Sequence, residues 1–198
     1  MPQRHPARSL DVLPRSLALG ALVLALMPGP AVEAGELAGV TLADTARVGE
    51  QTLVLNGLGL RKKAIFKVYV GGLYLPSKSR DADAILSADQ PRRMVLEFVR
   101  SVGSDSIAGA WSDCLEANVP GASQSLSQRF ERLSGWMADV ESGDQLVFTY
   151  DPGSGTEVQV RGATEGTLEG KDFADALFAC WIGAHPPSED FREGLLGN

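Results

Sequence analysis

The chain has 198 residues, which is enough for one domain with a substantial hydrophobic core. Its formal net charge at pH 7 is −7, and its only basic clusters, residues 61–63 and 92–93, are too short to act beyond their own surroundings. The composition therefore argues against binding to nucleic acid or to an anionic membrane.

The first 34 residues have the pattern of a secretory signal. Three arginines precede the apolar run Ser16–Met27, and Pro28 and Pro30 then break that run. The run is too short to span a bilayer, and small residues precede a cleavage site after Ala34. We predict a signal peptide at 1–34, export to the periplasm or the medium, and a mature domain at 35–198 without a stable membrane span. An uncleaved anchor is the alternative.

The first half of the domain is predicted to consist mostly of strands. Valine, leucine, phenylalanine and tyrosine are concentrated between turn residues in three runs, which are Thr52–Leu55, Ala64–Leu75 and Met94–Val99. A basic stretch joins the first two runs. Gly71-Gly72 predicts a bulge or a close approach of other atoms to the backbone. A short helix is predicted at Arg80–Ser87.

The second half is predicted to contain amphipathic helices and a hairpin. The helices are Ser104–Ala117, with Ser104 as N-cap, then Ser123–Val140, Lys171–Ile182 and a final short one at Phe191–Leu196. Asp151–Thr156 forms a hairpin turn between strands Gln145–Tyr150 and Glu157–Arg161, and Thr167–Leu168 adds a short strand. This order predicts an α+β fold, with an antiparallel sheet covered on one face by helices. The other face is expected to be partly open or covered by loops.

The sequence lacks the motifs of several enzyme classes. His185 is the only histidine after the leader, and two prolines follow it, which is typical of a surface turn. Catalytic triads and multi-histidine metal sites therefore have no support. Gly57 and Gly59 do not complete a dinucleotide fingerprint, because the third position is Lys62. We predict no cofactor and no metal.

Arg61 is the residue that points most directly to function. It lies eight residues before Tyr69, in an apolar stretch that is prone to form strands. Burying an arginine without a partner costs several kcal/mol, so Arg61 needs an acidic side chain, a cluster of carbonyls or an acidic ligand. Tyr74 follows Tyr69 by five positions, so the two side chains of a regular strand point to opposite faces.

The two cysteines, Cys114 and Cys180, both fall on the apolar sides of predicted helices. An exported domain tolerates a disulfide, but ordinary buried thiols occupy the same kind of position. The sequence does not supply the Cα separation that decides between the two. The pairing stays open at this point.

The chain resembles the chalcone isomerase fold family, and most of all its bacterial, signal-bearing members. The resemblance extends over Val40–Gly197 and rests on the order of several short motifs: Gly57-x-Gly-x-Arg61, Phe66-Lys-Val-Tyr69 running into Gly72–Leu75, Met94–Arg100 before the Ser104 helix, Trp181-Ile-Gly183 and Leu195-Leu-Gly197. The resemblance implies an open-faced β-sandwich, in which a ligand cleft lies between a large antiparallel sheet and the helices.

Two functions are associated with this family. Chalcone isomerases close a flavonoid ring, whereas plant fatty-acid-binding relatives hold an alkyl carboxylate with an arginine and a tyrosine, which Arg61 and Tyr69 match. The isomerases have a threonine at the position of Tyr69, and they have a tyrosine and an asparagine that segments 102–105 and 109–113 lack. The resemblance thus implies a non-catalytic pocket for a small amphiphilic carboxylic acid. Cys180 and Trp181 would line the same cleft.

Two alternatives remain at this stage. One is an isomerase, an intramolecular lyase of the chalcone isomerase type, in which Arg61 steadies a developing oxyanion and Tyr69 orients it. General acid–base catalysis normally needs a group that titrates near neutrality, and the sequence offers no suitable histidine. The other is a structural or assembly partner without a ligand, which predicts a filled cavity and an internal acidic partner for Arg61.

Overall fold

The structure is a computed structural model that describes Met1, Gln3 and residues 34–198, and the latter belong to one compact unit. The predicted signal peptide, with its apolar run, lies outside the described residues. Within the part of the chain that is described, no helix combines the length and the apolar character needed to cross a bilayer.

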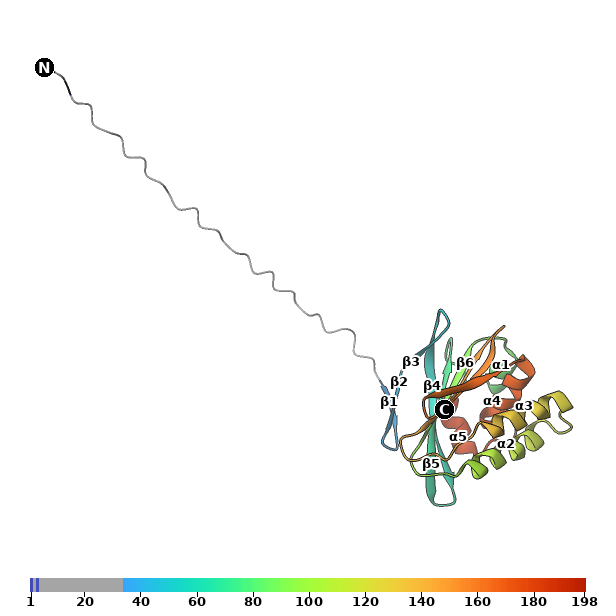
Figure 1. Cartoon of the computed structure of the whole chain (residues 1–198). Helices are drawn as coiled ribbons and strands as arrows, with labels where there is room; N and C mark the ends of the chain where they lie inside the picture. Colours follow the sequence, from blue (N-terminus) through green and yellow to red (C-terminus); the bar gives the residue numbers. More distant parts are fainter. Residues whose placement is uncertain (2, 4–33) are drawn as a thin grey trace. The chain divides into compact units, whose positions relative to one another are not determined.

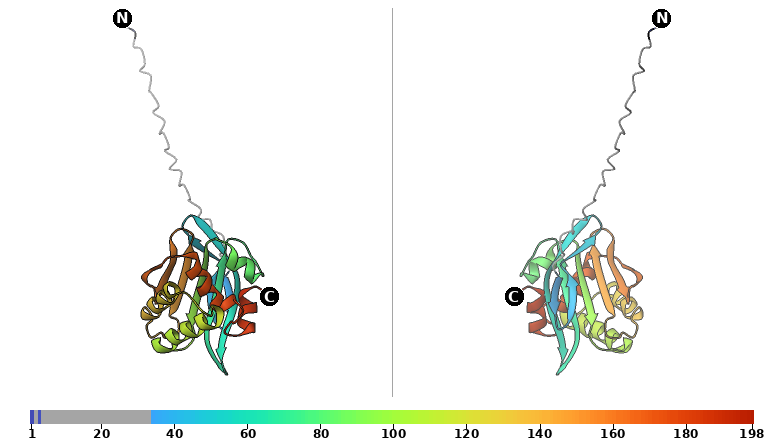
Figure 2. Two further views of the ribbon diagram at one scale, coloured as in Figure 1. Left: turned by 90° about the vertical axis from the view of Figure 1, so that its right-hand side faces the viewer. Right: turned by 90° about the vertical axis from the view of Figure 1, so that its left-hand side faces the viewer.

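A seven-stranded antiparallel sheet forms the centre of the domain. Its strands follow one another in chain order, so every neighbour in the sheet is also the next strand in the sequence. The sheet curls into a half-barrel (Figure 2). Its members are β3 (Thr45–Val48), β4 (Gln51–Lys63), β5 (Phe66–Leu75), β6 (Arg92–Phe98), β7 (Gln145–Asp151), β8 (Gly155–Val160) and β9 (Ala163–Leu168).

The helices gather on one face of this sheet (Figure 1). They are α1 (Ala82–Ser87), α2 (Ser104–Asn118), α3 (Gln124–Gly135), α4 (Lys171–Ile182) and α5 (Glu189–Leu195). Helix α4 contacts each of the other four and contributes eight buried residues to the main core. The predicted α+β class, with helices packed on one face of an antiparallel sheet, is confirmed, and α4 has the predicted bounds.

The opposite face carries a separate two-stranded ribbon rather than loops alone. Strands β1 (Ala34–Leu37) and β2 (Val40–Ala43) pair with each other, and β1 contacts β4. A second core forms there, in which Leu42 of the ribbon packs in one cluster with Leu55 and Tyr74 of the sheet. The Tyr74 hydroxyl donates a hydrogen bond of 2.8 Å to the carbonyl of Ala43. Tyr69 packs on the helical side, so the prediction of opposite faces is confirmed.

Strand β4 is much longer than the predicted Thr52–Leu55. It continues through the glycines and the basic residues to Lys63, because these residues pair with β5. Irregularities in the register at Leu55/Gly57 and at Arg61/Lys62 accommodate the extension. The connection is reduced to Ala64 and Ile65, with Ala64 at a φ of 53°.

The predicted bounds of α1 and α5 are partly wrong. Helix α1 begins at Ala82 rather than Arg80, and α5 spans Glu189–Leu195 rather than Phe191–Leu196.

The N-cap of α2 and the end of α3 also differ from the prediction. Gly103 rather than Ser104 caps α2, while the Ser104 N–H donates a hydrogen bond of 2.8 Å to the Asp139 carboxylate. Helix α3 ends at Gly135 and not at Val140. The reason is that Val140 forms an antiparallel bridge with Val102, which requires extended backbone.

The glycines of β4 and β5 have a structural role. Gly59 and Gly71 face each other across the ladder, and the buried ring of Phe191 from α5 lies against both. A Cβ atom at Gly59 would come within 2.5 Å of the Phe191 carbonyl oxygen, and one at Gly71 within 2.7 Å of its ring. These glycines therefore let α5 pack directly on the sheet, which confirms the predicted close approach at Gly71-Gly72.

Candidate functional site

A cavity of about 460 Å³ lies between the sheet and the helices. Strands β4 to β7 form one wall, and α2, α4 and the segment after α4 form the other. The volume falls within the range of roughly 300–1,000 Å³ that is typical of small-molecule sites.

The polarity of the cavity changes from its interior to its mouth. Leu96, Ile107 and Leu146 line it and are buried, so the interior is apolar. Lys63 and His185 line it as well but are exposed to solvent, so they mark the mouth. An interior of this kind accepts a hydrocarbon, and a charged mouth accepts a polar group.

Arg61 and Tyr69 are paired residues of the β4–β5 ladder, and both line the cavity. Arg61 is half-buried, between the apolar interior and the solvent. One of its N–H groups donates to the backbone carbonyl of the next residue, Lys62. Within residues 34–198, Arg61 forms no ion pair with an aspartate or a glutamate. A guanidinium has five N–H donors, so most of its hydrogen-bonding capacity is available to a ligand.

Arg92 shows how the same fold stabilises an arginine that has no ligand. Its side chain is fully buried and forms an ion pair with Asp175. It also donates a hydrogen bond of 2.9 Å to the carbonyl of Ile85, and its guanidinium lies 5.0 Å and 4.9 Å from the ring centroids of Tyr150 and Phe178. Arg61 has no such set of internal partners among the described residues.

Aromatic contacts hold the Tyr69 ring in place. The rings of Phe98 and Phe191 each lie 5.5 Å from it in an edge-to-face arrangement. Burial raises the pKa of Tyr69 to about 12, although a hydrogen bond from Trp181 and the charge of Arg61 both act to lower it. The ring retains some exposed surface because it borders the cavity. The hydroxyl thus stays protonated at neutral pH and remains a hydrogen-bond donor.

A disulfide joins Cys114 of α2 to Cys180 of α4, with a Cα–Cα distance of 5.4 Å. This separation is within the ordinary range for a disulfide. Both cysteines also line the cavity. The bond therefore ties together the two helices that form the helical wall.

The four residues proposed from the sequence as ligand contacts, Arg61, Tyr69, Cys180 and Trp181, all line this one cavity. Trp111 lines it too and packs edge-to-face on Trp181, with ring centroids 5.7 Å apart. Trp111 lies one helical turn before Cys114, which is the sequence signal that places them on the same face. In residues 34–198, no group of three or more histidine, cysteine, aspartate or glutamate side chains is arranged to hold a metal ion.

Sequence reasoning did not identify the residues at the mouth. His185 lies in an exposed turn, as predicted, but it also lines the cavity. Its backbone N–H donates a hydrogen bond of 3.0 Å to the side chain of Asn118, which connects the turn to the end of α2. Arg100 is exposed and does not line the cavity, and its guanidinium lies 4.9 Å from the centroid of the Phe66 ring.

A sequence profile described as chalcone isomerase-like matches residues 34–197. The chain belongs to the chalcone isomerase-like family. A solved structure of a fatty-acid binding protein from Arabidopsis thaliana has the same fold, with a TM-score of 0.66. The alignment covers 83% of this chalcone isomerase-like chain and 96% of the plant chain at 18% sequence identity, so the likeness concerns the fold. Comparison with curated protein sequences gave no match.

Proposed function

We propose that this chalcone isomerase-like domain is an exported, non-catalytic binding protein for a small amphiphilic carboxylic acid of the fatty-acid type. The observation that carries the proposal is the position of Arg61. It lies beside Tyr69 in the wall of an apolar cavity and has no carboxylate partner within residues 34–198. A carboxylate ligand supplies the missing counter-charge.

In the proposed complex, the ligand carboxylate accepts paired, charge-assisted hydrogen bonds from the Arg61 guanidinium. The Tyr69 hydroxyl donates a further bond to the same carboxylate. The alkyl chain extends into the interior, past Leu96 and Leu146, where it loses contact with water. Binding of the ligand in this way involves no covalent step.

The expected free energies are sufficient for micromolar binding. Each buried CH₂ group contributes about 0.8 kcal/mol, so ten of them contribute roughly 8 kcal/mol. Charged hydrogen bonds add about 1.5–3 kcal/mol each. Loss of translational and rotational freedom and ordering of the alkyl chain oppose binding by roughly 4 kcal/mol or more. The balance is near the 8 kcal/mol that corresponds to a micromolar dissociation constant.

Two further findings support this assignment over the alternatives from the sequence. The plant protein that shares the fold is a fatty-acid binding protein. A structural partner without a ligand predicts a filled cavity and an internal acidic partner for Arg61, and neither is present among the described residues.

The export part of the proposal rests on the basic and apolar pattern of the leader. The disulfide between Cys114 and Cys180 supports it, because such bonds persist in oxidising compartments and are rare in the cytosol. Fractionation of the producing cells and N-terminal sequencing of the mature protein test this part. A cytosolic product that still carries residues 1–34 would contradict it.

The experiment that tests the function is calorimetric titration with dodecanoate, together with mass spectrometry of an organic extract of the purified protein. Ala110 is exposed and borders the cavity from α2, so the indole of Ala110→Trp should obstruct the entry of a ligand. Ser112→Trp places the same ring on an exposed position of α2 outside this cavity and serves as the matched control. We expect micromolar binding by the wild type and the control, and a loss of at least tenfold in Ala110→Trp. Equal affinity in all three proteins would overturn the proposal.

A further inference from the structure

The end of the β4–β5 hairpin carries an unusual pair of apolar side chains. Within residues 34–198, Ile65 and Phe66 are the only large hydrophobic residues that are exposed, at 87% and 55%. They are adjacent, at the connection between the two strands. Both views in Figure 2 show the hairpin projecting beyond the rest of the domain. Exposed apolar residues that cluster in this way mark a surface that contacts something other than water.

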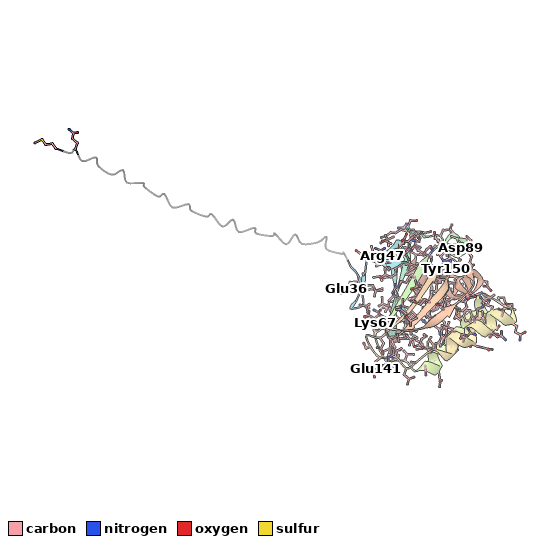
Figure 3. The ribbon with its side chains drawn as sticks, turned by 45° about the horizontal axis from the view of Figure 1, so that its top comes forward. Glu36, Arg47, Lys67, Asp89, Glu141 and Tyr150 are labelled. Carbon is pink, nitrogen blue, oxygen red and sulfur yellow. A yellow bond between two sulfur atoms is a disulfide. The ribbon has the colours of Figure 1, made fainter. Side chains whose placement is uncertain are left out.

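Cations surround this apolar pair. Lys62 faces Lys67 across the ladder, Lys63 faces Phe66, and the Arg100 guanidinium lies over the Phe66 ring. Lys67 is labelled in Figure 3, at the other end of the domain from Tyr150 and Asp89. The three lysines are exposed, and none of these four cations forms an ion pair within residues 34–198. These cations are scattered between positions 62 and 100 of the sequence. The folding of the hairpin beside the end of β6 brings them around the same apolar pair.

We propose that this hairpin end, residues 62–67 together with Arg100, docks onto the surface of an anionic lipid membrane. Ile65 and Phe66 enter the boundary between headgroups and acyl chains, while the lysines remain at the level of the lipid phosphates. Each lysine or arginine near such a surface strengthens binding measurably.

The acidic net charge of the protein does not prevent this contact. Electrostatic interactions between exposed charges are screened over about 8 Å at physiological ionic strength. The membrane therefore senses the local cations of the hairpin more strongly than the acidic residues elsewhere. A second copy of the chain is a poorer partner for the same surface, because it would bring a like-charged cluster against this one.

The mouth of the cavity lies next to the hairpin end that contacts the membrane in this proposal. Arg61 and Lys63 belong to the same hairpin and also line the cavity. Docking of the hairpin end therefore brings the mouth close to the lipid. If the proposed function holds, on which this step alone rests, an amphiphilic acid passes between the bilayer and the cavity without crossing bulk water.

Co-sedimentation of the protein with vesicles, without added fatty acid, tests the proposal. One set of vesicles is equimolar phosphatidylglycerol and phosphatidylcholine, and the other is phosphatidylcholine alone. The test variants are Ile65→Ser/Phe66→Ser and Lys62→Glu/Lys67→Glu, all at exposed positions. The control is Arg47→Glu/Lys78→Glu, which reverses two exposed cations outside the hairpin end.

We expect the wild type and the control to bind the anionic vesicles, and added salt to weaken that binding. The partition coefficient of both hairpin variants into the anionic vesicles should be at least about tenfold lower than that of the wild type. Hairpin variants that bind like the wild type would overturn the proposal. Failure of the wild type to co-sediment with anionic vesicles would also overturn it, and would instead indicate a protein partner.

The same samples separate the two proposals. A protein that binds dodecanoate but no vesicles would overturn the membrane contact alone. A protein that binds the anionic vesicles but no dodecanoate would support the contact and overturn the proposed function.

Discussion

Arg61 and Tyr69 occupy directly opposed positions on the β4–β5 ladder, and both side chains reach the same cavity. Opposed residues of an antiparallel pair have Cβ atoms about 4.5–5.5 Å apart. The ladder therefore sets the distance between the guanidinium and the phenol before any ligand arrives. Groups held on strands keep their geometry better than groups on loops, so the pair is preorganised for one carboxylate.

The three tyrosines are expected to ionise only at strongly alkaline pH. Burial is the largest cause in each case: it raises the pKa of Tyr69 and of Tyr150 to about 12, and it also raises that of Tyr74. The tyrosinate absorbance of Tyr69 and Tyr150 should therefore not appear near pH 10, where the unfolded chain titrates, and that of Tyr74 should be shifted upward. Because the raised pKa values belong to the folded state, stability should fall as the pH increases from about 10 towards about 12.

The pH dependence of dodecanoate binding should follow the ionisation of Tyr69. The affinity should stay constant from neutral pH to about 10, because Tyr69 keeps its proton, and should fall as its phenol ionises beside the carboxylate. Tyr69→Phe should abolish this fall in affinity at alkaline pH, and it should also remove one of the three tyrosinate absorbance transitions. A phenol that titrates near pH 10 in the wild type and is missing in Tyr69→Phe would contradict this account of the site.

Reduction of the disulfide should destabilise the domain considerably. Cys114 and Cys180 are separated by 66 positions, and a closed loop of this length corresponds to about 4 kcal/mol of loop-closure entropy. Urea unfolding with and without reductant measures the difference. The variant Cys114→Ala/Cys180→Ala should match the reduced wild type and show no response to reductant. An identical urea midpoint for oxidised and reduced wild type would refute the prediction.

Gly71→Ala tests the contact by which α5 supports the site. The new methyl group would overlap the Phe191 ring, whose edge-to-face contact helps to hold Tyr69. Overpacking of this kind costs about 1–3 kcal/mol, and we expect weaker dodecanoate binding as well. Gly109→Ala is the control, because nothing lies within 4 Å of its Cβ on α2. That substitution should stabilise the protein by roughly 1 kcal/mol and leave binding unchanged. Gly71→Ala with unaltered stability would show that Phe191 is not packed as described.

The elements with strong periodicity were predictable from the sequence. The apolar residues of Lys171–Ile182 recur at helical spacing, and the helix has these bounds in the structure. The alternation between Tyr69 and Tyr74 placed their side chains on opposite faces because β5 runs without a bulge between them. The family resemblance brought Cys180 and Trp181 to the same cleft as Arg61, and the structure has all three in the wall of one cavity.

The structural features that the sequence did not predict depend on contacts between residues that are distant in the sequence. Residues 56–63 read as a glycine-rich and basic connection, but pairing with β5 makes them strand, and Gly59 is needed to accommodate Phe191. Strands β1 and β2 have four residues each, which is too short for a periodic pattern to give a signal of its own. Arg100 lies over the Phe66 ring only because the end of β6 lies beside the hairpin.

The central claim is that Arg61 recognises a carboxylate, and comparison of two ligands with the same alkyl chain tests it most directly. Dodecanoate and dodecanol are titrated calorimetrically into the wild type, Arg61→Met and the control Arg100→Met, which changes an exposed cation outside the cavity. We predict that Arg61→Met weakens dodecanoate binding by about 10- to 100-fold and leaves dodecanol binding unchanged, while the control behaves like the wild type. Equal losses for both ligands, or no loss for dodecanoate, would contradict the claim.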